Sequence, residues 1–259
     1  MTQSRIKIVF LVPNLDTGGP QRVILDLAKN LDHSKFDVYI ISLINSNFLL
    51  DNFDYQNYCT IEYCNVKHLS RFQLISFSSA KILYSKLKRI RPNIIHSHLW
   101  GLTCLYLIAV FPFIFRYQIK YFHTIHTSGG YFTNKRFGDI IQLKTEMFLQ
   151  NITKATTVVI SQEIAKNAIS KLKLKKIIFI PNGIDTNKFN KNLKLKKADY
   201  GFLESDIIII FTSRGQESKG HKIAVEMLSR LEVKYPNLKL LFIGDGVKEL
   251  VNDQIKVLD

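Results

Sequence analysis

Residues 207–221 read IIIIFTSRGQESKGH. An apolar run typical of a buried strand ends in a polar, glycine-containing turn, and a helical pattern begins directly after it. The carboxyl end of a parallel strand that leads into a helix N-terminus is where open α/β sheets bind phosphate groups. Arg214 and Lys219 place two positive charges five residues apart in this turn. The stretch therefore predicts a diphosphate site, and an ordinary solvated turn is the alternative.

Strand and helix patterns alternate along most of the chain. Ile6–Val12 is typical of a wholly buried strand, and the helical pattern after it places apolar residues on one face, namely Val23, Ile24, Leu27, Ala28 and Leu31. Further strands are expected at 36–43, 60–66, 93–96, 118–122, 156–160 and 176–180, and helices at 74–90 and 163–172. Repeated strand–helix units of this length predict a parallel sheet that is covered by helices on both faces.

The alternation breaks at the sequence PNGID, residues 181–185, and a lysine-rich stretch follows. This change predicts a domain boundary at about residue 185, with a second domain at 186–259. In that domain we expect strands at 207–211 and 239–243, a helix at 221–235, and a last short helix before the end of the chain. Two strands and two helices cannot cover both faces of a doubly wound sheet, so the second domain is expected to be incomplete.

The composition describes a globular and strongly basic protein. The chain has 259 residues, 46% of them apolar, which is enough for a core and excludes disorder. Lys and Arg number 36 against 21 acidic residues, a net charge of +15 that favours nucleic acid, anionic lipid or an anionic substrate as partner. The basic residues are scattered and are not interleaved with aromatic residues, which disfavours a single-strand nucleic-acid groove.

Cysteines and apolar segments bear on the cellular compartment. The three cysteines, Cys59, Cys64 and Cys104, are an odd number without Cys-x-x-Cys spacing, which favours reduced thiols in the cytoplasm. The first residues have no secretory pattern. Residues 99–115 are uncharged and largely apolar. We expect a buried helix there that ends before Pro112, with a membrane span as the alternative.

Several short motifs follow one another in order over the whole chain. They are NLDTGGPQR at 14–22, RPNIIHSH at 91–98, TIHT at 124–127, PNGIDTNKF at 181–189, SR at 213–214 with KGH at 219–221, and FIGDG at 242–246. Together they resemble the retaining glycosyltransferases of family 4, bacterial sugar transferases with the GT-B fold. The resemblance implies an α/β protein of two Rossmann-like, doubly wound parallel-sheet domains: an N-terminal acceptor-side domain at 1–185 and a partial nucleotide-sugar domain at 186–259.

The resemblance also implies where a donor nucleotide sugar binds. Arg214 and Lys219 match the basic pair that holds the donor diphosphate in the family, in place of a divalent metal, so we expect no metal and no other cofactor. Gly18 and Gly19 match the family's glycine loop near the donor phosphates, and such glycines let the backbone approach a ligand. The turn formed by Gly244, Asp245 and Gly246 matches a position near the nucleotide. An ordinary tight turn is the alternative for both glycine segments.

Two histidines are candidates for the sugar-binding region. His126 matches the catalytic histidine that approaches the donor sugar in the family, and a neutral imidazole there can donate or accept a hydrogen bond. A surface or capping histidine is the alternative. His123 is the less favoured candidate because it falls within a strand pattern. His98 is expected on the acceptor side, and the pair His96 and His98 alone supplies too few ligands for a metal.

The chain departs from the family pattern in two respects. Family members carry a Glu-x(7)-Glu motif and a terminal helix beyond the position of Asp259, and neither is present. We therefore expect a truncated chain, either a fragment or a naturally short product, with weak or no transferase activity. Gln21 stands where the family usually has an acidic residue, so one local contact is expected to differ.

The resemblance implies transfer of a hexosyl group from a nucleoside diphosphate sugar to a lipid-linked or polysaccharide acceptor in cell-surface glycan synthesis. The basic charge and the aromatic-aliphatic stretch at 106–122 suggest peripheral contact with an anionic membrane face, from the cytoplasmic side. Two alternatives remain: a non-catalytic remnant that binds nucleotide or anionic lipid, and an enzyme like the nucleotide-sugar 2-epimerases. A nucleic-acid-binding protein is favoured by charge alone.

Overall fold

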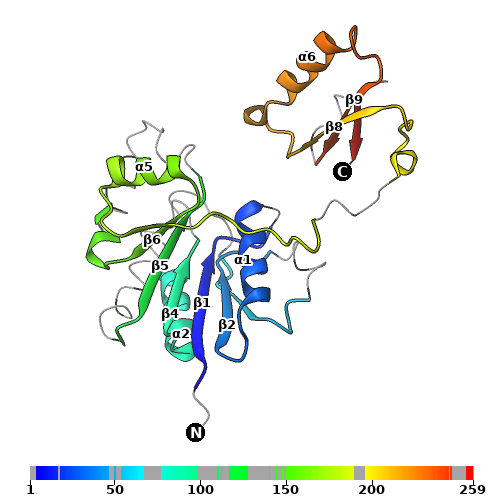
Figure 1. Ribbon diagram of the computed structural model, residues 1–259. Helices are drawn as coiled ribbons and strands as arrows, with labels where there is room; N and C mark the ends of the chain where they lie inside the picture. Colours follow the sequence, from blue (N-terminus) through cyan, green and yellow to red (C-terminus); the bar gives the residue numbers. More distant parts are fainter. Residues whose placement is uncertain are drawn as a thin grey trace. The chain divides into compact units, whose positions relative to one another are not determined.

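The chain divides into two compact units, each a continuous segment: unit 1, Met1–Ile184, and unit 2, Asp185–Asp259. The computed structural model describes residues 4–16, 18–46, 50, 54–66, 77–98, 110, 112, 117–127, 140, 144, 147–148, 150–189, 196–244, 246 and 255–258. Figure 1 shows the helices and strands of both units along the chain. The acceptor-side and nucleotide-sugar roles of the two parts stay predictions.

Unit 1 contains a parallel sheet, which confirms the expected α/β fold. Its strands are β1 (Ile6–Val12), β2 (Phe36–Ser42), β3 (Thr60–Tyr63), β4 (Ile94–Ser97), β5 (Lys120–Ile125), β6 (Thr156–Val159) and β7 (Ile177–Phe179). Within the described residues the strand order is β3-β2-β1-β4-β5-β6-β7, and every neighbouring pair is parallel. The inner strands β1, β4, β5 and β6 bury most of their residues, as is usual for a parallel sheet that helices cover on both faces.

Three helices of unit 1 have bounds within the described residues: α1 (Gly19–Asn30), α2 (Phe77–Ile90) and α5 (Gln162–Leu172), numbered as in Figure 1. Side chains alternate between the two faces of a strand, so one strand serves two cores. In β1, Ile8 and Phe10 pack with residues of α1, whereas Val9 and Leu11 pack with residues of α2. A third cluster joins α5 to the carboxyl ends of β5 and β6. The helices α1 and α2 therefore cover opposite faces.

The strand order reverses direction at β1. The chain continues from β1 to β2 on one side, whereas β4 pairs with β1 on the other side. At such a switch point the loops that leave the carboxyl ends of the two strands diverge, and open α/β sheets bind ligands there. A ligand site in unit 1 is therefore expected at the loop after β1 and the residues after β4.

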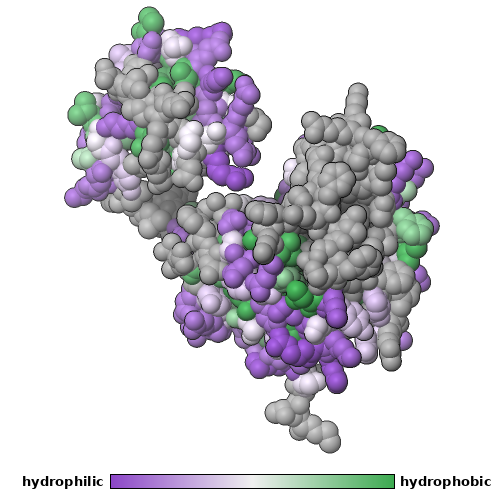
Figure 2. Space-filling view, turned by 180° about the vertical axis from the view of Figure 1, so that it is seen from behind, coloured by the Kyte–Doolittle hydropathy of each residue, from purple (hydrophilic) through white to green (hydrophobic). Residues whose placement is uncertain are grey.

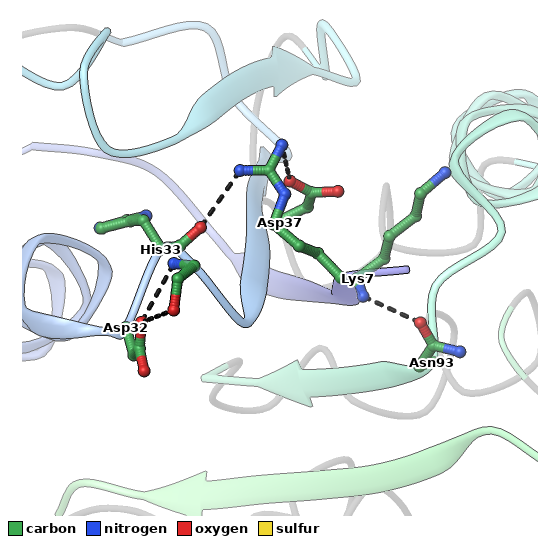
Figure 3. Close-up of polar contacts among 7 residues, drawn as sticks. Lys7, Asp32, His33, Asp37 and Asn93 are labelled. Atoms are coloured by element: carbon green, nitrogen blue, oxygen red, sulfur yellow. Dashed lines mark hydrogen bonds and ion pairs between the residues drawn. The ribbon is translucent and has the colours of Figure 1, made fainter. Parts of the chain in front are cut away.

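Polar contacts tie the strands together at the amino ends, on the opposite edge of this sheet (Figure 3). Arg5 forms an ion pair of 2.8 Å with Asp37 and donates a hydrogen bond of 3.1 Å to the backbone carbonyl of His33. The backbone N–H of Lys7 donates to the Asn93 side chain at 2.8 Å. These contacts align the starts of β1, β2 and β4, which is a structural role.

Unit 2 contains a smaller parallel sheet. Its elements are the 3-10 helix η2 (Lys197–Tyr200), β8 (Ile207–Thr212), the 3-10 helix η3 (Glu217–Lys219), α6 (His221–Leu231), β9 (Leu238–Ile243) and β10 (Ile255–Leu258). The order is β10-β9-β8, and both pairs are parallel. Ala224 and Leu228 of α6 pack on Leu240, Phe242 and neighbouring apolar residues of this sheet.

Several details of the secondary structure differ from the sequence prediction. A helix was expected at the end of the chain, but residues 255–258 form the strand β10. The helix α6 ends at Leu231, whereas it was expected to reach Tyr235. The expected buried strand at 207–211 is wrong in burial: within the described part of the chain β8 is the edge of its sheet, and Ile207 and Ile210 are 51% and 59% exposed. Pro112 is itself helical, whereas the helix was expected to end before it.

Hydrophilic side chains cover much of the described surface seen in Figure 2, with apolar residues scattered between them. Among the described residues, no helix has the length and apolar character needed to cross a membrane. Most of the apolar stretch 99–115 lies outside those residues. Cys59 and Cys64 are buried free thiols, and burial raises their pKa values to about 12 and about 11.

Candidate active site

The loop after β1 leads directly into the N-terminus of α1. Leu15 anchors the loop in the core, and Gln21 Nε2 donates a hydrogen bond of 2.8 Å to Asn14 Oδ1. A carboxylate could not make this donation, so the departure from the family at Gln21 has a local structural consequence. Gly18 is the N-cap residue of α1 and no side chain caps the helix, so its first N–H groups can meet an anion.

The two glycines of this loop differ in their surroundings. A Cβ atom at Gly18 would lie 2.3 Å from the flexible side chain of Gln21, whereas a Cβ atom at Gly19 would meet no atom within 4 Å. The space beside Gly19 is therefore open enough for a ligand to approach the backbone. Thr17, between Asp16 and Gly18, lies outside the described residues.

Four histidines gather at the carboxyl ends of β4 and β5, next to the switch point. His96 and His98 belong to β4 and the position after it, and His123 and His126 to β5 and the position after it. The parallel register aligns Ser97 with His123, which brings the two histidine pairs side by side. The rings of His96 and His98 have centroids 4.2 Å apart, and those of His98 and His126 are 5.1 Å apart.

Hydrogen bonds connect these side chains across the two strands. His98 Nδ1 and His126 Nε2 are 2.8 Å apart, and His96 Nε2 is 2.8 Å from Thr124 Oγ1. Ser97 Oγ lies 2.8 Å from His123 Nδ1 and 2.7 Å from the Tyr121 hydroxyl. His98 and His123 are buried, while His126 is partly exposed. Of the two histidines joined by the 2.8 Å contact, His126 is therefore the one with a partly exposed side chain; His96 is also partly exposed.

Burial keeps all four imidazoles neutral at neutral pH. It lowers the pKa of His126 to about 4 and, together with repulsion from neighbouring histidines, lowers the pKa values of His96 and His123 to about 3. The pKa of His98 lies well below its ordinary value for the same two reasons, burial being the larger. A neutral imidazole exchanges hydrogen bonds with a ligand without bringing a charge.

The structure places His98 and His126 together, whereas the sequence assigned them to different parts of the site. His126 directly follows β5, at the strand end where it was expected. The ring of His98 contacts His126 and Phe10, and its expected place on the acceptor side stays a prediction. His96 and His123 complete the cluster, although neither of them was assigned a role in the site from the sequence. The cluster could have been inferred from the sequence, because two consecutive strands both have histidines at or near their ends.

A second group of candidate residues lies at the carboxyl end of β8 in unit 2. Arg214 and Lys219 are both exposed on the turn from β8 to α6, and neither forms an ion pair with a described residue. Gly220, with φ 84°, is the N-cap residue of α6, and no side chain caps this helix. His221 Nε2 lies 3.1 Å from Ser213 Oγ and thereby joins the two ends of the turn. Two cations therefore adjoin an uncapped helix N-terminus.

Glycines bring the turns after β8 and β9 into direct contact. A Cβ atom at Gly215 would lie 1.9 Å from the backbone oxygen of Gly246, and one at Gly244 would lie 2.5 Å from that of Ser213. Gly244 and Gly246 also have φ values of 136° and 79°, which favour glycine. The predicted nucleotide-proximal turn therefore touches the turn that carries Arg214. Asp245 lies outside the described residues.

The described residues contain no group of three histidine, cysteine, aspartate or glutamate side chains arranged to hold a metal ion. The expectation that the reaction needs no metal stays a prediction.

Comparison with known proteins identifies the family. Residues 17–188 match the model of Glycosyltransferase Family 4, and the chain belongs to that family. The match includes Gly18 and Gly19, at the start of α1, and all four histidines of the cluster. A search of curated protein sequences gives no match.

Solved structures show the same fold. Sucrose-phosphate synthase from Thermosynechococcus elongatus is similar with a TM-score of 0.71 at 16% identity, over 98% of this chain and 70% of that one. UDP-GlcNAc 2-epimerase from Neisseria meningitidis, bound to UDP-GlcNAc, has a TM-score of 0.59 at 14% identity, over 98% and 72%. An alpha-glucosyltransferase in complex with UDP and DNA has a TM-score of 0.62 at 10% identity, over 99% and 68%. The chain is thus a glycosyltransferase with the GT-B fold.

Proposed function

We propose that this glycosyltransferase moves a hexosyl group from a nucleoside diphosphate sugar to a lipid-linked or polysaccharide acceptor in cell-surface glycan synthesis. The observation that carries the proposal is the turn from β8 to α6, where the exposed cations Arg214 and Lys219 adjoin an uncapped helix N-terminus. Both features attract a diphosphate. The family match and the nucleotide-bound structural relatives support the same substrate class.

The chemistry explains why cations are needed at this turn. In the reaction, the bond between the anomeric carbon and the diphosphate oxygen breaks, a bond to the acceptor oxygen forms, and the acceptor proton is lost. Negative charge grows on the leaving diphosphate as its bond breaks. The Arg214 guanidinium and the Lys219 ammonium stabilise that charge more in the transition state than in the bound donor, which lowers the activation free energy of the transfer. In this proposal the two cations take the place of a divalent metal.

The other candidate residues take supporting roles in the proposal. His126 meets the donor sugar with a neutral ring nitrogen, and Gly18 and Gly19 let the backbone approach the diphosphate. Gly244 and Gly246 lie near the nucleotide. His98 acts through His126, as its contact indicates. Retention of the anomeric configuration follows the family resemblance.

The test is a binding measurement on the whole chain. Replacing Arg214 and Lys219 together by alanine is expected to weaken the binding of UDP or GDP by at least about a hundredfold, because each charge-assisted hydrogen bond contributes about 1.5–3 kcal/mol. Isothermal titration calorimetry gives the affinities. Arg230→Ala is the matched control, since Arg230 is an exposed cation in the last turn of the same helix. Equal affinity in the double variant and the control would contradict the diphosphate role.

The non-catalytic alternative predicts binding without turnover. A panel of nucleotide sugars with lipid-linked acceptors, followed by product analysis, separates the two readings. Transfer of the sugar supports the proposed enzyme, and binding of a nucleotide sugar without transfer or hydrolysis supports the alternative. The 2-epimerase alternative rests on fold similarity, and the family match favours the transferase.

Peripheral membrane contact is a separate part of the proposal, motivated by the net charge of +15. The chain is expected to sediment with vesicles of phosphatidylglycerol but not with vesicles of phosphatidylcholine, and salt should weaken the association. Identical sedimentation with both vesicle types would remove membrane contact from the proposal.

A further inference from the structure

His98 holds one ring nitrogen against His126 and leaves the other one without a partner. Its side chain is 96% removed from solvent, since only 4% of the residue is exposed. Nδ1 of His98 lies 2.8 Å from His126 Nε2. Nε2 of His98 is buried and has no hydrogen-bond partner among the residues that the structure describes. This asymmetry constrains where the protons of both rings lie.

Two neutral imidazoles that share one hydrogen bond have two possible proton arrangements. In the first, His98 Nδ1–H donates to His126 Nε2, so His126 carries its own proton on Nδ1. In the second, His126 Nε2–H donates to His98 Nδ1, so His98 carries its proton on the buried Nε2. The first arrangement leaves a bare lone pair at His98 Nε2, and the second leaves an N–H there.

The surroundings of His98 favour the first arrangement. Its ring lies between Phe10, at a centroid distance of 5.8 Å, and the rings of His96 and His126. Either arrangement loses one hydrogen bond to water at the buried nitrogen, but buried N–H groups without an acceptor are rarer in proteins than buried acceptors without a donor. The proton of His98 is therefore better placed on Nδ1, where His126 accepts it.

We propose that His98 is a positioning residue that fixes His126 in the Nδ1–H tautomer, so that His126 presents a hydrogen-bond donor to an oxygen atom of the ligand. The tautomer follows from the contacts of His98 alone. Only the nature of the ligand, a nucleotide sugar whose hydroxyl or phosphate oxygen accepts the bond, rests on the proposed function. With Nδ1 already protonated and Nε2 occupied by His98, His126 acts in this proposal as a donor and not as the base that removes a proton from the acceptor.

The decisive experiment is a long-range proton–nitrogen correlation spectrum of the ring nitrogens in the whole 15N-labelled chain at neutral pH. His98 and His126 are both expected to carry their proton on Nδ1. Finding the proton of His126 on Nε2 in the wild-type protein would overturn the proposal. The spectrum requires neither substrate nor activity, so its result is independent of the test of the proposed function.

Variants of His98 test whether that residue sets the tautomer. His98→Leu removes the donor, and His126 should change to the Nε2–H form that histidine side chains favour in water. His98→Asn should restore the Nδ1–H form, because its amide nitrogen lies as many bonds from Cα as Nδ1 does. His33→Asn is the control, since His33 precedes β2 at the opposite sheet edge. A tautomer unchanged in His98→Leu would overturn the positioning role, and a failure of that variant to fold leaves the wild-type and His98→Asn spectra to decide.

Ligand titrations identify the oxygen that His126 meets. UDP, UDP-glucose and UDP-N-acetylglucosamine are added to the labelled chain, with calorimetry in parallel. A shift of the His126 Nδ1–H signal with UDP alone identifies a phosphate oxygen, and a shift with the sugar nucleotides only identifies a sugar hydroxyl. Binding without any shift would overturn the donor role toward the ligand. Absence of binding by all three would contradict the proposed function and leave the tautomer result in place.

Discussion

Acidification from about pH 7 to about pH 4 is expected to unfold unit 1, because the four clustered histidines cannot accept protons while it is folded. Their pKa values lie below the ordinary 6.5, near 3 for His96 and His123 and near 4 for His126. Below pH 6.5 the unfolded chain binds protons that the native unit does not. Stability is therefore unaffected by these groups above pH 6.5 and is lost as the pH falls towards 4.

The expected effect is large. Each such histidine lowers the free energy of unfolding by up to about 1.4 kcal/mol per pH unit in this window. Four of them together can remove several kcal/mol per pH unit, against a total stability of roughly 5–15 kcal/mol for an ordinary domain. Urea denaturation at a series of pH values, followed by hydrogen exchange of amides in unit 1, measures the loss. His33→Gln should leave the profile unchanged, whereas a profile flat between pH 6.5 and 4 would show that the cluster titrates normally.

Gly215→Ala is expected to destabilise unit 2 by about 3 kcal/mol, the upper range for forcing an atom into a packed site. The added Cβ atom would lie 1.9 Å from the backbone oxygen of Gly246, and backbone cannot move aside as a flexible side chain can. Because the same substitution separates the turns after β8 and β9, it should also weaken the binding of UDP.

Gly183→Ala is the matched control for this substitution, since a Cβ atom at Gly183 meets nothing within 4 Å. Thermal unfolding of both variants, with hydrogen exchange to assign the transition to unit 2, gives the comparison. If Gly215→Ala melts at the same temperature as Gly183→Ala, the two turns are not in the close contact described.

The sequence was sufficient to predict the parallel sheet of unit 1. A strand such as β1 is buried between helices on both faces, so it forms a short, largely apolar run before a helical pattern. Burial in unit 2 was harder to predict, because an isoleucine run such as Ile207–Ile210 looks the same at the edge of a sheet as at its centre. β10 was mistaken for a helix because its four residues are too few for a period, and pairing with β9 decides their conformation.

The candidate site shows the same division between local and non-local information. Short motifs were sufficient to single out His126, His98, Arg214 and Lys219. The contact between His98 and His126 could not be predicted, because it depends on the register in which Ile94 lies opposite Lys120. The inclusion of His96 and His123 depends on the same register. Sequence patterns thus indicate which residues lie at strand ends, and strand pairing decides which of them touch.

Each unit is one uninterrupted segment, and the chain passes from one to the other once, between Ile184 and Asp185. A gene can therefore be divided or recombined at a single codon junction without cutting through a hydrophobic cluster. Hybrids that join unit 1 to the corresponding second half of a related enzyme become simple to build. Exchange of halves at such a junction would also give evolution a simple way to combine units from different enzymes.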